Sequence, residues 1–451
     1  MMDVVKTSRL MGYLTQSIYW VVFVFYQIIW HLAIPLIFLR LFLRGQKQTG
    51  YLKNIPERFG FYKTKVPFQE CIWIHAVSVG ETRAAQSLVK ELVLQGHKVL
   101  LTHMTVTGRQ TGSEIFSEYL QSGAMVQMYL PYDFCWPVSN FYRFFKPTLG
   151  LIMETEVWPS LIQFAKFRKM PIALINGRLS KRSASRFLTA GLLSKTTFMG
   201  FNEVLAQTQI DVDNFHRLGI NHCYVTGNLK FDHEIDEAQV LLGKEIRKTY
   251  LNQRPVVCAV STREGEEELI LKAWQDVDQS SHPLLIIVPR HPQRFDEVVE
   301  KISAAHFSVL RRTDFKEGAV YASDVVLGDS MGEMMTYVSM SDFVVMGGTL
   351  LEYGGQNLIE PCSLAKPIIQ GPHTFNFAQA SIDAKKSGAS FDLGSYLSED
   401  ELINRLTATI NLLLKDTKRL AEASQAALSF SETYHGATQK TLAILEPYLR
   451  K

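Results

Sequence analysis

From about residue 70 onward, short apolar runs alternate with amphipathic stretches such as Thr82–Gln95 and Gly108–Gln121. Several of the runs are continuously apolar, which is typical of strands in a parallel sheet that is covered by helices on both faces. We therefore predict a doubly wound α/β domain. Its predicted strands are Cys71–Val77, Lys98–Thr102, Met125–Leu130, Thr148–Met153, Pro171–Ile175 and Glu203–Ala206.

A second series of apolar runs begins near residue 255. Between the two series, Phe231–Arg254 is polar and charged, so we place a domain boundary there. The predicted organisation is an N-terminal segment at 1–48, a first α/β domain at 49–232 and a second at 233–451 that ends in helices from Asp400. Two such domains facing a cleft would bind ligands at the carboxyl ends of their strands. The strands predicted in the second domain are Pro255–Val260, Leu284–Val288, Ser308–Leu310, Asp324–Leu327, Phe343–Met346 and Pro367–Gln370.

The N-terminal segment contains a long apolar stretch. Ile18–Leu39 holds 22 residues without a formal charge, and as one helix it would span roughly 33 Å, enough to cross a bilayer core. A signal peptide would be shorter and would end at a small-residue cleavage site, whereas this stretch runs into Arg40 and Arg44. A buried core helix is the other alternative, which apolar residues on every face disfavour. We predict a membrane anchor, and Pro35 leaves open whether it crosses the bilayer or bends within one leaflet.

The net charge of the chain is concentrated beside this stretch. The 451 residues carry 47 Lys and Arg against 44 Asp and Glu, a formal charge of +3. Residues 1–47 hold five basic side chains and one acidic side chain, or +4, which leaves −1 for the rest. A chain so close to neutral is not expected to bind nucleic acid. The basic residues that follow the apolar stretch predict that the bulk of the chain lies on the cytoplasmic side of a membrane.

Cysteine usage and composition restrict the class of protein further. The hydrophobic fraction of 47% excludes a mostly disordered chain. The five cysteines are widely spaced and include no CxxC pair, which indicates a reducing compartment. No His/Cys cluster has the spacing of zinc ligands.

Carboxylates follow two predicted strands of the first domain. Glu81, in the sequence VSVGET, falls near a helix N-terminus, where it either stabilises the helix dipole or acts as a general base at the edge of the cleft. The helix N-terminus is expected to keep Glu81 ionised and so to weaken it as a base. Glu154 and Glu156 share one face if the preceding strand continues, so both would point into the cleft. Helix capping or a solvated acid is the alternative for Glu156.

Basic residues and glycines follow other strands. Arg290 ends a strand as a cation suited to a phosphate or a carboxylate. Glycine-rich stretches at 328–333, 347–348 and 354–361 offer backbone N–H groups to a phosphate, and together they favour a nucleotide site over ordinary loops. A further basic group suits an anionic substrate or a lipid headgroup, with a solvated face as the alternative. This group is Arg178, Lys181, Arg182 and Arg186.

The chain contains, in order, the motifs HAVSVGE, LIMETEVWP, NGRLS, TGNLKFD, STREGEE, VPRHPQRF, GDSMGEM, GGQNLIEP and GPHTFNF. Together these motifs resemble the 3-deoxy-D-manno-octulosonic acid (Kdo) transferases of lipopolysaccharide biosynthesis. The resemblance runs from the apolar stretch to Glu446–Leu449. It implies a glycosyltransferase of the GT-B fold that is anchored on the cytoplasmic face of the inner membrane. Such an enzyme moves Kdo from CMP-Kdo to a tetraacylated lipid A precursor (lipid IVA).

The resemblance also implies roles for individual residues. Glu81 matches the general base of the family, and Glu154 and Lys230 match residues that stabilise the transition state. The segments that match the CMP-binding residues of the family are Pro289, Arg290, Met331, Gly332, Glu333, Asn357, Leu358, Ile359 and Glu360.

The chemistry agrees with these roles. An acceptor hydroxyl is a poor nucleophile, so a carboxylate must take its proton as the new bond forms. CMP is a good leaving group with one phosphate, so we expect inversion by direct displacement, without a metal or a cofactor. The alternatives are another nucleotide-sugar enzyme of the same fold, such as a different glycosyltransferase or an epimerase, and a non-catalytic membrane-tethered binding module.

Overall fold

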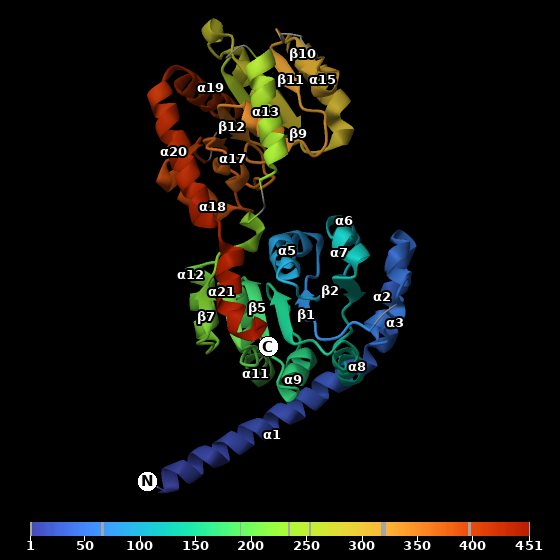
Figure 1. The fold of residues 1–451 in the computed structure, drawn as a ribbon. Coiled ribbons are helices and arrows are strands. Elements are labelled where there is room, and N and C mark those ends of the chain that lie inside the picture. The colour runs from blue at the N-terminus through green and yellow to red at the C-terminus, as the bar shows by residue number, and fades with distance from the viewer. Residues whose placement is uncertain are drawn as a thin grey trace. The chain divides into compact units, whose positions relative to one another are not determined.

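The computed structural model of the chain describes residues 2–64, 67–189, 191–232, 235–251, 254–316, 322–395 and 398–450, with side chains from residue 16 onward. It divides into two compact units (Figure 1). The first consists of Met1–His233 with Gly436–Lys451, and the second is Glu234–His435. The side chains of Lys6 and Arg9, which contribute to the N-terminal charge, lie outside the described residues.

The first unit is built on a seven-stranded parallel sheet in the order β3-β2-β1-β4-β5-β6-β7. The strand order reverses between β1 and β4, so the loops that follow these two strands diverge and leave room at the sheet edge. All six predicted strands are present, with their ends shifted by at most two residues, and β7 is an additional short edge strand. The strands are β1 (Ile72–His75), β2 (Val99–His103), β3 (Met125–Tyr129), β4 (Leu149–Met153), β5 (Ile172–Gly177), β6 (Glu203–Ala206) and β7 (Cys223–Val225).

Helices cover both faces of this sheet because its strands are apolar on both faces. Ile72 and Ile74 pack in one core cluster with Leu88 of α5, whereas Trp73, between them, packs in the other with Phe141 of α8. Besides the two N-terminal helices, which are described below, the helices between the start of the chain and β7 are α3 (Ile55–Arg58), α4 (Val79–Ala84), α5 (Gln86–Leu94), α6 (Val106–Ile115), α7 (Ser117–Ser122), α8 (Cys135–Phe145), α9 (Pro159–Phe167), α10 (Lys181–Thr189), α11 (Leu192–Phe198) and α12 (Gln209–Arg217). Two short 3-10 turns, η1 (Thr49–Leu52) before β1 and η2 (Leu229–Phe231) after β7, complete this part of the unit.

The second unit contains another seven-stranded parallel sheet, in the order β10-β11-β9-β8-β12-β13-β14. The strand order reverses between β8 and β12. The six strands predicted here are also present within two residues, and β14 is additional. The strands are β8 (Val256–Thr262), β9 (Leu284–Pro289), β10 (Val309–Arg311), β11 (Val325–Leu327), β12 (Phe343–Met346), β13 (Ile368–Gln370) and β14 (Ser390–Asp392).

One face of the second sheet packs against α14, α15 and α19 in a single apolar cluster. The helices of this unit are α13 (Glu237–Tyr250), α14 (Glu266–Gln275), α15 (Phe295–Ala304), α16 (Met334–Met340), α17 (Ile359–Ser363), α18 (Ala378–Ser387), α19 (Glu399–Lys415) and α20 (Thr417–Tyr434), with 3-10 turns η3 (Gln279–Ser281), η4 (Pro292–Arg294) and η5 (Arg312–Asp314).

The last helix, α21 (Ala437–Leu449), belongs to the first unit and not, as the sequence predicts for 233–451, to the second. Leu442 and Leu445 of α21 are buried in the same apolar cluster as Leu88 and Leu92 of α5. At its start, the Gly436 N–H donates to Asp232 Oδ1 at 2.8 Å. The chain therefore returns to its first domain because the apolar face of α21 is buried there.

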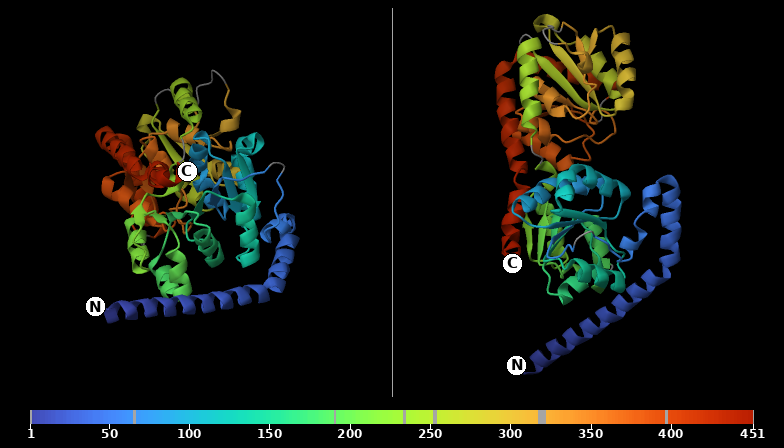
Figure 2. Two further views of the ribbon diagram at one scale, coloured as in Figure 1. Left: turned by 60° about the horizontal axis from the view of Figure 1, so that its bottom comes forward. Right: turned by 45° about the vertical axis from the view of Figure 1, so that its right-hand side comes forward.

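The apolar N-terminal stretch forms two helices, α1 (Met2–Leu32) and α2 (Ile34–Lys47), and not one (Figure 2). Ile18–Leu39 is therefore not one continuous helix, and the bend that Pro35 left open is present. The break falls at Ala33, because Pro35 has no N–H to continue the hydrogen-bond ladder of α1 and takes a position in the first turn of α2. In the part of the chain that the structure describes, none of the helices taken alone combines the length and the apolar character that a membrane span needs. Gln16–Leu32 and Ile34–Lys47 together have the length and composition, but they are bent by 47°.

Candidate active site

In the first unit, loops that follow parallel strands bring acidic side chains together. Glu81 lies in the first turn of α4, directly after β1, and Glu154 follows β4. His75 of β1 pairs with Ile152 of β4, so the carboxyl ends of these strands are neighbours at the point where the strand order reverses. Glu154 and Glu156 lie close enough to Glu81 for their charges to raise its pKa. The three carboxyl groups therefore form one cluster.

Glu81 is held firmly at the start of its helix. Its Oε2 accepts a hydrogen bond from Val77 N at 2.8 Å, and its Oε1 accepts one from Ser78 Oγ at 2.9 Å. Ser78 is the N-cap of α4 and accepts a hydrogen bond from Glu81 N at 3.4 Å. Each carboxylate oxygen has two lone pairs. These bonds therefore orient Glu81 and still leave it able to accept a proton.

Burial sets the protonation of Glu81. The residue is only 8% exposed, and the loss of water around it raises its pKa from 4.5 to about 7, with a smaller increase from Glu154 and Glu156. Hydrogen bonds from Val77 and Ser78 act in the opposite direction. The prediction that the helix N-terminus keeps Glu81 ionised and weakly basic is therefore wrong, because desolvation outweighs it. A pKa near 7 suits a general base at neutral pH.

Glu154 occupies a strained turn and not the end of a strand. β4 ends at Met153, as predicted, so the condition under which Glu154 and Glu156 would share one face of a continuing strand is not met. Glu154 has a left-handed backbone with a φ of 56°, and its N–H donates to Ile175 O at 3.0 Å. Such backbone strain in a residue other than glycine persists where the surrounding structure enforces it, often at functional sites.

Cations lie beside Glu154. Burial raises its pKa, whereas Arg178 and Lys230 lower it. Burial also raises the pKa of Glu156, which accepts a hydrogen bond from Trp158 Nε1 at 3.0 Å. The site therefore combines a partly buried carboxyl cluster with at least two positive charges. The other basic residues predicted in this region are exposed on α10; they are Lys181, Arg182 and Arg186.

A chain of side-chain amides positions Lys230. Asn228 Oδ1 accepts a hydrogen bond from Lys230 N, and Asn176 Oδ1 accepts one from Leu229 N, each at 3.0 Å. Gln207 links the two asparagines, because its Nε2 donates to Asn176 O at 3.1 Å and its Oε1 accepts from Asn228 Nδ2 at 3.2 Å. Asn176 lies near the end of β5, and Gln207 and Asn228 lie in the loops after β6 and β7. We refer to Asn176, Gln207 and Asn228 as the amide clamp; the sequence pattern does not predict this grouping.

The two buried histidines that end β1 and β2 are neutral. His75 Nδ1 lies 2.9 Å from Thr102 Oγ1, and His103 Nδ1 lies 2.9 Å from Ala76 O. Burial lowers the pKa of His75 to about 3 and that of His103 to about 4. In contrast to Glu81, neither histidine titrates near neutral pH.

In the second unit, the predicted nucleotide-binding residues follow three strands of one sheet. Pro289 ends β9, and the exposed Arg290 follows it, with its N–H donating to Thr262 O at 3.0 Å. Met331, which is 69% exposed, and Gly332 lie between β11 and α16. Because the strands are parallel, these residues lie at the same edge of the sheet as the segment that precedes α17.

The remaining predicted residues are held by local contacts. Glu333 accepts hydrogen bonds from Ser330 Oγ and, at 3.2 Å, from Arg312 Nη2. Asn357 Nδ2 donates to Glu360 Oε1 at 2.9 Å. Two predicted contact residues have buried side chains, so only their backbone could meet a ligand; they are Leu358 and Ile359. Among the residues that the structure describes, no three or more His, Cys, Asp or Glu side chains are grouped so that they could hold a metal ion.

The glycine pair after β12 is already hydrogen-bonded within the protein. Gly348 N donates to Glu266 Oε2 at 2.7 Å and Leu350 N to Glu266 Oε1 at 2.9 Å, while Gly347 N donates to Val260 O at 2.9 Å. The prediction that Gly347 and Gly348 offer these N–H groups to a phosphate is therefore wrong. Glu266, which is fully buried, accepts the hydrogen bond from the Gly348 N–H.

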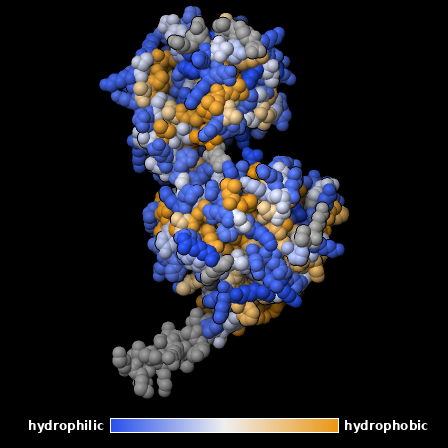
Figure 3. Space-filling view, in the orientation of Figure 1, coloured by the Kyte–Doolittle hydropathy of each residue, from blue (hydrophilic) through white to orange (hydrophobic). Residues whose placement is uncertain are grey.

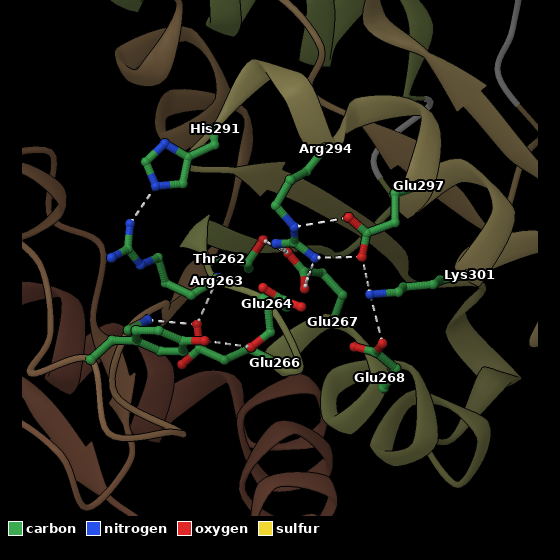
Figure 4. Close-up of polar contacts among 12 residues, drawn as sticks. Thr262, Arg263, Glu264, Glu266, Glu267, Glu268, His291, Arg294, Glu297 and Lys301 are labelled. Atoms are coloured by element: carbon green, nitrogen blue, oxygen red, sulfur yellow. Dashed lines mark hydrogen bonds and ion pairs between the residues drawn. The ribbon is translucent and has the colours of Figure 1, made fainter.

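A buried ion pair supports the loop after β8 (Figure 4). Glu267, which is fully buried, accepts hydrogen bonds from Arg294 at 2.8 and 3.0 Å and from Thr262 Oγ1 at 2.7 Å. Away from this pair, Arg263 Nη1 lies 2.5 Å from His291 Nε2. This contact joins the loops after β8 and β9 and adds Arg263 to the cations at this edge of the sheet.

The chain is similar to known proteins over most of its length. Residues 53–233 match the family model of the 3-deoxy-D-manno-octulosonic-acid transferase (kdotransferase). The chain is 38% identical over 422 residues to the 3-deoxy-D-manno-octulosonic acid transferase of Bordetella pertussis, a match that covers 92% of this chain and 96% of that protein. It is 32% identical to the protein of the same name from Haemophilus influenzae, with the same coverage.

Among solved structures, the chain resembles the UDP-GlcNAc 2-epimerase from Neisseria meningitidis bound to UDP-GlcNAc. The TM-score is 0.54 at 14% identity, and the match covers 84% of this chain and 100% of that chain. At this identity the likeness concerns the fold alone, which is the GT-B type of two parallel-sheet α/β domains.

Proposed function

The chain belongs to the family of 3-deoxy-D-manno-octulosonic acid (Kdo) transferases, and on that premise we propose that Glu81 is the general base of its transfer reaction. The protein is thus a glycosyltransferase of lipopolysaccharide biosynthesis. The observation that carries the proposal is the state of Glu81, a carboxyl group that is oriented by two hydrogen bonds, almost buried and of pKa about 7.

The proposed donor is CMP-Kdo, and the proposed acceptor is a lipid A precursor (lipid IVA). The acceptor hydroxyl gives its proton to Glu81 while its oxygen bonds to the anomeric carbon of Kdo. The bond from that carbon to the phosphate of CMP breaks, and its electron pair leaves with CMP. Attack from the side opposite the leaving group inverts the anomeric carbon. Glu81 then releases the proton to water, so the atoms and charges balance without a further reactant.

Lys230 and Glu154 are proposed to stabilise the transition state. Lys230 and Arg178 supply positive charge next to Glu154, and fixed charges act strongly in a site from which water is excluded. The amide clamp supports this role, because it fixes the backbone N–H groups of both Leu229 and Lys230.

The second unit is proposed to bind CMP-Kdo at the carboxyl edge of its sheet. Arg290, with Arg263 on the neighbouring loop, supplies the positive charge that one phosphate requires. The other proposed contacts are Pro289, Met331, Gly332, Glu333 and the segment Asn357–Glu360. We propose that the reaction needs no metal and no cofactor, since a single phosphate is a smaller charge to balance than a diphosphate.

We further propose that α1 and α2 attach the protein to the inner membrane, with both domains on the cytoplasmic side. The acceptor is a lipid that stays in the bilayer, so attachment raises the effective concentration of enzyme and acceptor. Arg40, Arg44 and Lys47 follow the apolar stretch and suit anionic headgroups.

The test is to incubate the purified full chain with CMP-Kdo and lipid IVA and to weigh the lipid product. The proposal expects the mass of the lipid to increase by one or more Kdo units, with release of CMP. An unchanged lipid mass, under conditions in which CMP-Kdo is stable, would contradict the assigned substrates. Conversion of a nucleotide sugar without an acceptor would instead favour an epimerase.

A further inference from the structure

Helix α1 has two different faces from residue 19 onward. Tyr19 and Phe23 are 6% and 5% exposed, and with Tyr26, Gln27 and Trp30 they form a stripe at helical spacing. This stripe packs against the rest of the first unit: the ring centroids of Trp30 and Phe134, for example, lie 5.5 Å apart. We call this stripe the inner face of α1.

The inner face makes polar contacts with the body of the first unit. The Tyr19 hydroxyl donates to Gln163 Oε1 at 3.2 Å on α9. Gln27 Nε2 donates to Ser160 Oγ at 2.8 Å, and Gln27 Oε1 accepts a hydrogen bond from Cys135 N at 3.0 Å at the start of α8. The only amide in the apolar stretch is therefore satisfied by protein.

Asp133 is the centre of this contact. Its carboxylate, 1% exposed, accepts hydrogen bonds from Ser160 N at 2.8 Å and Leu161 N at 3.0 Å at the start of α9. It also accepts one from the Tyr26 hydroxyl at 2.8 Å. The same carboxylate thus caps α9 and holds α1.

The opposite face of α1 and much of α2 are apolar and exposed. Of the 29 large hydrophobic side chains that are exposed in the described part of the chain, 14 lie between residues 18 and 43. They include Phe25, Ile29 and Leu32, which are 60%, 64% and 74% exposed. Figure 3 shows apolar surface next to the grey N-terminal residues. Arg40, Arg44 and Lys47 are exposed at the end of this surface.

A helix that crosses a bilayer alone is surrounded by lipid on every side, but α1 is not. The contacts from Tyr19 to Trp30 extend over roughly 17 Å of helix, more than half of a hydrocarbon core of about 30 Å. If α1 crossed the bilayer, the starts of α8 and α9 would be drawn into the hydrocarbon. The exposed charges of Lys166 and Arg168 at the end of α9 would follow, and charges are costly there.

We propose that α1 and α2 lie along one leaflet of an anionic bilayer and do not cross it. Their exposed apolar face enters the acyl chains, their inner face stays on the protein, and Arg40, Arg44 and Lys47 meet anionic headgroups. The bend at Ala33 lets the two helices follow the membrane surface. The N-terminus then stays on the same side of the membrane as both domains. This inference rests on the proposed membrane attachment.

The test is the sidedness of the two ends of the full chain, expressed in a Gram-negative host with one epitope before Met1 and another after Lys451. Protease is added to intact spheroplasts and, separately, to lysed ones. The proposal expects both epitopes to survive in intact spheroplasts and both to be cleaved after lysis. Cleavage of the N-terminal epitope alone in intact spheroplasts would overturn it, because a crossing helix places that end outside.

A second measurement tests the binding face with liposomes that contain or lack anionic lipid. Ile29→Asp is expected to lower binding of the full chain to anionic liposomes at least tenfold. Its matched control is Leu241→Asp on α13, which is equally exposed at 65% but distant in sequence and is expected to leave binding unchanged. Equal binding of both variants would overturn the assigned face. A chain that stays soluble would contradict membrane attachment itself, whereas the lipid-product mass tests Kdo transfer separately.

Discussion

Ser78 and Glu81 hold each other at the start of α4: the Ser78 hydroxyl donates to Glu81 Oε1 at 2.9 Å and accepts from Glu81 N at 3.4 Å. The first bond favours the ionised carboxyl and lowers its pKa, and the second caps the helix. One hydroxyl therefore affects both the stability of α4 and the basicity of Glu81.

The pH dependence of transfer should follow the protonation of Glu81. A base acts only when it is deprotonated, so kcat/KM of the native chain is expected to rise with pH up to about 7 and then to level off. Ser78→Ala removes a hydrogen bond to the ionised form, so the pKa of Glu81 rises and the acid limb shifts to higher pH. Ser78→Thr keeps the hydroxyl and serves as the control. A limb that stays in place in Ser78→Ala would contradict the role of this bond.

The stability of the chain should also depend on Glu81. Its pKa is raised from 4.5 to about 7 in the folded state, so between these values the unfolded state binds fewer protons than the folded state. The free energy of unfolding therefore falls as the pH rises through this window, and ionised Glu81 is a cost above it. Glu81→Gln is expected to raise Tm relative to the native chain at pH 8 and to have little effect at pH 4.5. An identical change in Tm at both pH values would contradict the raised pKa.

The amide clamp should matter for catalysis more than for folding. Asn228→Ala removes the bond that fixes Lys230 N, and a small displacement of a catalytic group can cost up to about 100-fold in rate. We expect kcat to fall at least tenfold with little change in KM for CMP-Kdo. Asn140→Ala on α8, where the side chain accepts a hydrogen bond from Arg143, is the control and should remain active. A normal kcat in Asn228→Ala would show that Lys230 does not need the clamp.

The buried ion pair of the second unit should be essential for its stability. Arg294→Ala removes two of the three side-chain hydrogen bonds to Glu267 described above and leaves the bond from Thr262. Loss of one partner of a buried ion pair lowers the free energy of unfolding by about 3–5 kcal/mol. The exposed pair of Lys272 and Glu399, whose side chains are 54% and 58% exposed, provides a control. Lys272→Ala should lower the free energy of unfolding far less, because water screens an exposed ion pair. Urea unfolding of the two variants measures the difference, and equal losses would contradict the importance of burial.

The sequence predicts the two sheets well because their strands are short, apolar and separated by amphipathic helices. The hydrophobic pattern does not single out β7 and β14, which are three-residue strands at sheet edges, although it does predict β10, which is equally short. The return of α21 to the first unit is missed as well. The unit to which α21 belongs depends on which apolar surface buries Leu442 and Leu445, and the order of apolar and polar residues along the chain does not contain that information.

The sequence predicts which residues form the candidate site, but not the pKa values or the hydrogen bonds of those residues. The motif around Glu81 identifies the carboxylate, whereas its pKa depends on burial by segments distant in the sequence. The same limitation explains Gly348, whose N–H is taken by Glu266, 82 positions away. One local feature of the sequence, the pair Asn176-Gly177, indicates part of the amide clamp. Asparagine tolerates the left-handed backbone that Asn176 adopts here with a φ of 52°.

The role of Glu81 is tested most directly by the transfer activity of Glu81→Ala, measured as the mass of the lipid product, alongside its binding of CMP-Kdo. Glu114→Gln, an exposed carboxylate on α6, is the matched control and should transfer Kdo normally. We expect Glu81→Ala to form no Kdo-lipid product while it binds CMP-Kdo as the native chain does. Near-normal turnover of Glu81→Ala would contradict the assignment of Glu81 as the base.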